Sequence, residues 1–172
     1  SPDAVCLAVM RGRAIGIHDP FTALDSFCVI NGKASLYGDA PLSIARQHLD
    51  WIEAGYDEYF EVGGKRIEGN PPADAWKQPM TRCVGKTQRR GGTQKTWTFS
   101  VEDANLAGLF GKNGSLYGGY PHRMLRFRCR GYALRDSFGD ALKGIGIREL
   151  EDLEQPKDAA QPVGRINIRP KR

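Results

Sequence analysis

The sequence predicts an α+β domain in which antiparallel hairpins form a small sheet and helices pack on one side of it. Asn31-Gly32 separates two strand-like runs, a strong short-range signal for a hairpin. A second hairpin is predicted around Gly63-Gly64, and a third strand pair joins residues 80–87 to 94–100. Helical patterns lie on both sides of these hairpins, and this order of elements is typical of α+β domains.

Length and composition predict one core domain over residues 1–154 and a polar tail or exchangeable arm over 155–172. The chain has 172 residues, of which 40% are hydrophobic, enough to bury a core. No apolar run approaches the roughly 18 residues of a membrane span, so no membrane partner is expected. The four cysteines form no CxxC motif. We therefore expect no zinc site and a reducing, cytoplasmic environment.

The first part of the chain is predicted to hold three helices around the first hairpin. The first covers residues 3–15, with Ser1 or Asp3 as its cap. A short helix begins at Pro20, because proline suits the first turn. A third helix covers 39–48, capped by Asp39.

Further helices are predicted after the strands. Ser100 and Asp103 resemble a capping box, which starts a helix that ends near residues 108–111. A glycine-rich loop follows at 111–119, and Pro121 opens a long arginine-rich helix. A separate short helix is expected at 137–143.

Positive charge is concentrated in one part of the chain. Residues 77–135 hold 12 Lys and Arg against 2 Asp and Glu, a charge of +10, whereas the rest of the chain carries −5. Such an asymmetry indicates a surface that meets a polyanion, and nucleic acid is the obvious candidate.

The arginine-rich helix divides its arginines into two sets. At 100° per residue, Arg123, Arg126 and Arg130 lie within about 60° of one another on one face. Arg128 and Arg135 project near the apolar side. The first set is either a solvated face or a phosphate contact, to which the planar guanidinium fork is suited. The second set either joins that contact or pairs with acids such as Asp136 and Asp140.

The basic hairpin and the glycine-rich loop add further candidates for phosphate contact. On the hairpin these are Lys86, Arg89, Arg90 and Lys95, and Arg89 and Arg90 lie at the predicted turn. Trp97 is interpreted as a core residue, with base stacking as the alternative. Lys112 lies in the loop, where small residues let a backbone approach phosphates closely.

Neither a nucleotide site nor a catalytic set is recognisable in the sequence. Gly85-Lys86-Thr87 imitates the end of a phosphate-binding loop, but Met80 stands where that motif requires glycine. No nucleophile, base and orienting group occur together, so we expect no enzyme, metal or cofactor. The main alternative is a metal-dependent nuclease, with acids drawn from Asp57, Glu58, Glu61 and Asp103. An assembly protein whose basic face meets an acidic protein is a third possibility.

The chain resembles the RecT family of phage-type recombinases, which are single-strand DNA annealing proteins. The clearest part is PHRMLRFRCRGYALRDSFGDALKG at 121–144, which is similar to the family signature YP-x-RML-x-x-RAR-x-x-ALRD-x-FPD-x-L-x-G. Cys129 replaces the usual alanine and Gly139 the usual proline. Residues 10–39 and 99–114 also resemble family segments, with Phe110 where tryptophan is common. Together the similar segments span about residues 10–144.

This resemblance implies a protein that binds single-stranded DNA and anneals it to a complementary strand without ATP. It implies assembly into rings or helical filaments, and work in a bacterial host beside a 5′→3′ exonuclease and the host single-strand binding protein. Family members extend further at both ends, and the segment that contacts the host protein is expected to be short or missing here. The implied DNA-binding residues are those of the basic region, namely Lys86, Arg89, Arg90, Lys95, Lys112, Arg123, Arg126, Arg128, Arg130 and Arg135.

Overall fold

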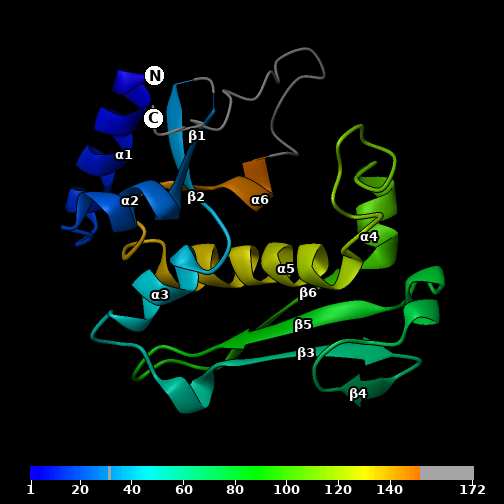
Figure 1. The fold of residues 1–172 in the computed structure, drawn as a ribbon. Helices are drawn as coiled ribbons and strands as arrows, with labels where there is room; N and C mark the ends of the chain where they lie inside the picture. The colour runs from blue at the N-terminus through cyan, green and yellow to red at the C-terminus, as the bar shows by residue number, and fades with distance from the viewer. Residues whose placement is uncertain (31, 152–172) are drawn as a thin grey trace, which may run out of the picture.

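The protein folds as the predicted α+β domain, and a computed structural model describes residues 1–30 and 32–151 (Figure 1). The strands form two sheets. One has three strands in the order β1-β2-β7, and the other has four in the order β4-β3-β5-β6. The tail predicted at 155–172 and the domain boundary at 154 lie outside the described residues.

The first part of the chain forms the predicted helices and hairpin. Their bounds are Pro2–Ala14 (α1), Pro20–Ser26 (α2), Phe27–Ile30 (β1), Lys33–Leu36 (β2) and Ala40–Arg46 (α3). The Ser1 hydroxyl accepts from the backbone N–H of Ala4 and caps α1. Asp39, which the sequence predicts as the cap of α3, makes no capping hydrogen bond.

The second sheet contains the two other predicted strand pairs. Its strands are Asp57–Val62 (β3), Lys65–Ile67 (β4), Arg82–Thr87 (β5) and Lys95–Ser100 (β6), preceded or interrupted by short 3₁₀ helices at Glu53–Gly55 (η1) and Ala73–Lys77 (η2). Gly63 and Gly64 join β3 to β4 with φ of 55° and 76°, a left-handed conformation that favours glycine. All neighbouring strands in this sheet are antiparallel.

Helices α4 (Val101–Leu106) and α5 (Pro121–Phe138) follow the second sheet. The predicted capping box is confirmed, because the Ser100 hydroxyl accepts from the Asp103 N–H at 3.0 Å and the Asp103 carboxylate accepts from the Ser100 N–H at 2.8 Å. α5 lies across one face of the sheet (Figure 1). A Cβ on Gly85 of β5 would lie 3.3 Å from the Cys129 sulfur, so glycine there permits close packing of α5 on the sheet.

The chain after α5 differs from the prediction. The short helix expected at 137–143 does not form, because α5 continues to Phe138 and turns follow it. Lys143 and Gly144 have positive φ, 48° and 71°, which interrupts a right-handed helix. Strand β7 (Gly146–Ile147) then pairs in parallel with β2 and leads into α6 (Arg148–Glu151).

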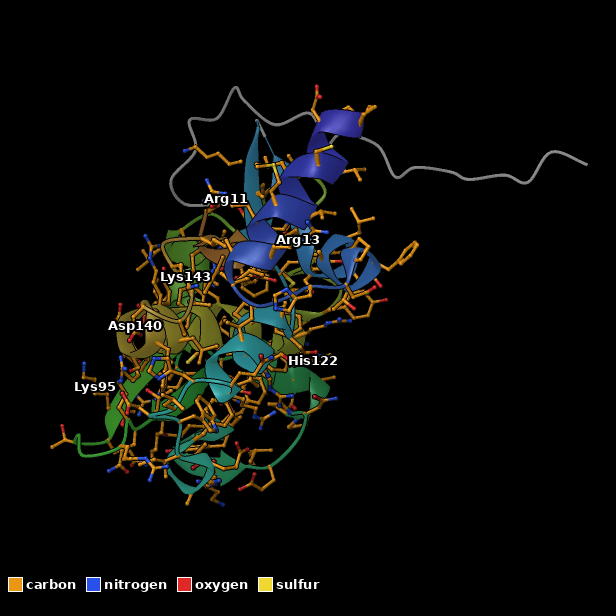
Figure 2. The ribbon with its side chains drawn as sticks, turned by 90° about the vertical axis from the view of Figure 1, so that its left-hand side faces the viewer. Arg11, Arg13, Lys95, His122, Asp140 and Lys143 are labelled. Atoms are coloured by element: carbon orange, nitrogen blue, oxygen red, sulfur yellow. The ribbon has the colours of Figure 1, made fainter. Side chains whose placement is uncertain are left out.

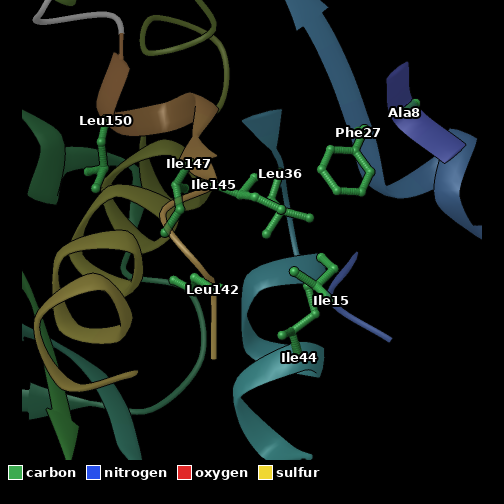
Figure 3. Close-up of a cluster of buried hydrophobic side chains, with 9 residues drawn as sticks. All are labelled: Ala8, Ile15, Phe27, Leu36, Ile44, Leu142, Ile145, Ile147 and Leu150. Carbon is green, nitrogen blue, oxygen red and sulfur yellow. The ribbon is translucent and has the colours of Figure 1, made fainter. Parts of the chain in front are cut away.

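Helix α5 lies between the two main hydrophobic clusters. The cluster on the side of the three-stranded sheet is shown in Figure 3 and comprises Ala8, Ile15, Phe27, Leu36, Ile44, Leu142, Ile145, Ile147 and Leu150. The other lies between α5 and the four-stranded sheet and includes Phe60, Phe99, Leu125 and Cys129. Tyr132 of α5 packs against both clusters. The arginine-rich helix is therefore the central element of the fold.

Candidate nucleic-acid interface

The ten basic residues predicted to contact nucleic acid do not form one surface. Arg128 and Arg130 are buried side chains of α5 itself, and Lys86 lies on the outer face of the four-stranded sheet. The remaining seven are divided between the two ends of α5. Because α5 has 18 residues, its ends are separated by about 25 Å.

Arg130 is buried and paired, which differs from its expected place on a solvated face. Its Nε and Nη2 donate to the two carboxylate oxygens of Glu58, both at 2.7 Å, and Nη1 contacts Asp39. The side chains of Arg130 and Glu58 are only 9% and 11% exposed. Burial alone would lower the pKa of the Arg130 guanidinium, but its bonds to Glu58 dominate and raise it. Arg130 therefore ties α5 to β3.

Arg128 is fully buried and is the largest side chain in the described residues with that degree of burial. Its Cζ lies 5.6 Å from the ring centroid of Phe99 and 6.0 Å from that of Tyr117. Its Nε and Nη1 have no hydrogen-bond partner among the described residues. Pairing with Asp136 or Asp140, one of the two alternatives for Arg128, is not seen at these two atoms; Asp136 accepts from the Trp97 indole N–H and Asp140 from Arg89.

A cluster around Arg89 lies at the C-terminal end of α5. The Arg89 guanidinium donates to Asp50 at 2.7 Å and to Asp140 at 2.9 Å and 3.0 Å, and its Cζ lies 5.4 Å from the Phe138 ring centroid. His48 is 3.3 Å from Asp140. The bonds from Arg89 lower the pKa of the Asp140 carboxyl. Arg89 therefore fastens the segment between β5 and β6 to the end of α5.

Three predicted residues beside this cluster are exposed, namely Arg90, Lys95 and Arg135. Lys95 opens β6 opposite Thr87, on the side of the sheet that faces α5. The backbone N–H of Arg90 donates to the Asp50 carbonyl at 2.8 Å, which directs the 88–94 segment along the same end of the molecule. All three side chains add positive charge to this end of the molecule.

The sequence interpretation missed three further basic residues at this end: Arg11, Arg13 and Lys143. Figure 2 shows Arg11 and Arg13 on α1 above Lys143, with Asp140 and Lys95 below it. Lys143 donates to the Ala14 carbonyl at 2.5 Å, which connects the end of α1 to the turn after α5. No sequence pattern joins residues 129 positions apart, so this proximity appears only in the fold. We call the exposed residues Arg11, Arg13, Arg90, Lys95, Arg135 and Lys143 the basic end face.

The N-terminal end of α5 carries a smaller group formed by Lys112, Arg123 and Arg126. Lys112 and Arg123 are exposed, and the Arg123 Cζ lies 5.2 Å from the Phe127 ring centroid. Arg126 is partly buried, donates to the Gly69 carbonyl at 3.0 Å and lies over the Phe60 ring. Arg126 therefore braces α5 against the segment after β4.

Lys86 belongs to neither end, because it lies on the outer face of the four-stranded sheet. The hydroxyl of its neighbour Thr87 bonds to Ser137 of α5, so alternation directs Lys86 to the opposite face. There its Nζ lies 5.3 Å from the Tyr59 ring centroid. The Gly85-Lys86-Thr87 sequence lies inside β5 rather than between a strand and a helix. It therefore lacks the backbone setting of a phosphate-binding loop.

The acids considered for a nuclease do not converge. Asp57 pairs with Arg66 and Glu61 with Arg82, whereas Glu58 lies toward α5 and Asp103 caps α4. Within residues 1–30 and 32–151, no three His, Cys, Asp or Glu side chains are grouped to hold a metal ion. In the same residues no helix has the length and apolar character needed to cross a bilayer.

No protein-family model matches the chain, and neither does any curated protein or solved structure.

Proposed function

We propose that this protein binds single-stranded DNA and anneals complementary strands without ATP, as a homo-oligomer in phage-type recombination. The observation that carries the proposal is the similarity of residues 121–144, with the two upstream segments, to the RecT signature. We further propose that it acts in the bacterial cytoplasm beside a 5′→3′ exonuclease and the host single-strand binding protein.

The positions of the signature residues support this proposal through the fold. Of the signature residues, Arg130 and Asp136 bond α5 to Glu58 and Trp97, and Asp140, in the turn after α5, accepts from Arg89. The signature is therefore interpreted mainly as a scaffold, and fewer of its arginines are left for DNA than the sequence suggests.

The basic end face supplies the cations for strand binding in this proposal. Six exposed cations lie there, and Arg89 neutralises part of the charge of Asp50 and Asp140. Contacts to phosphate hold a strand without reading its sequence, so the bases stay available to test a second strand. Base pairing then supplies the free energy of annealing, and no ATP is required.

The first experiment measures annealing directly. Two complementary labelled oligonucleotides are added in succession to the protein, without ATP or magnesium and at low salt, and duplex formation is followed with time. We expect pairing to be faster than in a protein-free control and to occur in a large complex. Binding without faster pairing would show that the protein only binds single strands. Shortening of the labelled oligonucleotides after magnesium is added would indicate a nuclease.

A second experiment locates the binding surface. Replacing both Arg90 and Lys95 with alanine should flatten the dependence of log affinity on log salt by about 1.4, because each lost phosphate contact contributes about 0.7 on a single strand. Lys65→Ala serves as the matched control, since Lys65 is an exposed lysine on the distant edge strand β4. An unchanged slope in the double variant would remove the basic end face from the DNA path.

A further inference from the structure

Arg128 has an unusual environment for a charged side chain. It is fully buried, yet its Nε and Nη1 have no acceptor among the described residues. Its guanidinium lies beside the aromatic rings of Phe99 and Tyr117. The electron-rich face of a ring attracts a cation, but it does not satisfy N–H donors that lie in the plane of a guanidinium.

Such a group fits an anion better than it fits the closed interior. A buried donor without a partner is unfavourable, and a buried charge without a counter-charge is more so. Nε and one Nη of arginine form the fork that binds two oxygens of a phosphate or carboxylate at once. Arg128 therefore has the hydrogen-bond donors that an anion site needs, although the side chain is buried in this structure.

The segment that contributes Tyr117 beside Arg128 is rich in glycine. Residues 107–120 join α4 to α5 (Figure 1). Their Tyr117 ring lies beside the Arg128 guanidinium. Gly108 and Gly114 have φ of 68° and 72°, and residues 107–120 contain five glycines in all. The segment is held partly by its own contacts, since the Ser115 hydroxyl bonds to the Leu109 carbonyl and the Phe110 and Tyr117 rings are 5.5 Å apart.

Charge around this segment favours an incoming polyanion. Residues 107–120 contain no acid, and they carry Lys112. Arg123 is exposed in the first turn of α5. An anion that approaches the N-terminal end of α5 therefore meets the exposed Arg123 before it reaches Arg128.

We propose that residues 107–120 form a lid that opens on single-stranded DNA, so that Arg128 receives a backbone phosphate. This inference rests on the proposed function and adds a second contact region to the basic end face. It gives Arg128 a role that burial alone does not explain.

The test replaces Arg128 with methionine, an apolar side chain of similar length. We expect the melting temperature of the free protein to rise by about 2 °C or more, because an unsatisfied buried charge is removed. We also expect oligothymidylate to bind at least about tenfold more weakly, with a salt slope flatter by about 0.7. The matched control is Arg123→Met, an exposed arginine on the same helix, which should leave the melting temperature unchanged.

A lower melting temperature with an unchanged salt slope would overturn the proposal and make Arg128 purely structural. A wild-type protein that binds no oligothymidylate would instead refute the proposed function itself. Arg128-dependent binding of a polyglutamate peptide in preference to oligothymidylate would assign the site to an acidic protein and overturn the lid's DNA role.

Hydrogen exchange of wild-type residues 107–120 gives an independent measurement, since oligothymidylate should accelerate it while α5 stays protected. No acceleration would count against the lid.

Discussion

Replacing Arg130 with alanine should strongly destabilise the fold. The variant leaves Glu58, whose side chain is 11% exposed, without the two bonds that satisfy its carboxylate. Removing one member of a buried ion pair costs about 3–5 kcal/mol, because the remaining charge stays desolvated. For a chain of this length that corresponds to a fall in melting temperature of about 6–20 °C. Asp39 adds little to this value, since its side chain is 78% exposed.

Urea and thermal denaturation followed by circular dichroism measure this loss. Because the pair is buried, the loss should persist at high salt, where surface pairs are screened. Replacing Glu58 with leucine and Arg130 with methionine together should recover most of the stability, since an apolar pair leaves no unpaired charge. Arg123→Ala, on the exposed side of the same helix, should change stability by less than about 0.5 kcal/mol. A loss below about 1 kcal/mol for Arg130→Ala, as at a surface pair, would refute the assignment of Arg130 to the interior.

Three other predictions concern packing, pH and thiol chemistry. Gly12→Ala should destabilise the protein by about 1–3 kcal/mol in urea, because the new methyl group would lie 2.8 Å from the Ala23 Cβ. Arg89→Ala should lower the melting temperature at pH values above the ordinary pKa of Asp140, near 3.8. This difference between wild type and variant should disappear as the pH falls through the lowered pKa that Asp140 has in the folded protein. Alkylation of Cys28 in the native protein, followed by mass spectrometry, should be slow at pH 8 and accelerate toward pH 11, because burial raises the pKa of that thiol to about 11.

Local signals in the sequence account for most of the elements. The glycines of the β3–β4 turn and the capping box at Ser100 act within a few residues, so their outcome is readable from the chain alone. β7 pairs in parallel with β2. Because β7 has only two residues, it is too short to show a periodic pattern in the sequence. Its existence depends on a partner more than a hundred residues earlier, and no local rule supplies that.

The candidate site was harder to predict for a related reason. Residues 121–135 contain no acid, which favoured a phosphate contact for Arg130, but Glu58 reaches it from β3, 72 positions away. A helical wheel gives the direction of a side chain but does not show which residues of other elements it contacts. The same limit applies to Arg128, whose aromatic neighbours come from β6 and the segment before α5.

The pairing of β2 with β7 also sets the order in which the protein can be completed during synthesis. The Ser35 hydroxyl bonds to Glu151 across 116 positions, and the Gly38 N–H bonds to Glu149 across 111. At ordinary elongation rates about 5–20 s separate the emergence of these partners from the ribosome. During that interval Phe27 and Leu36 lack the late-made half of their cluster, Ile145 and Ile147. The nascent chain therefore presents an unfinished apolar surface until Ile145 and Ile147 have been made.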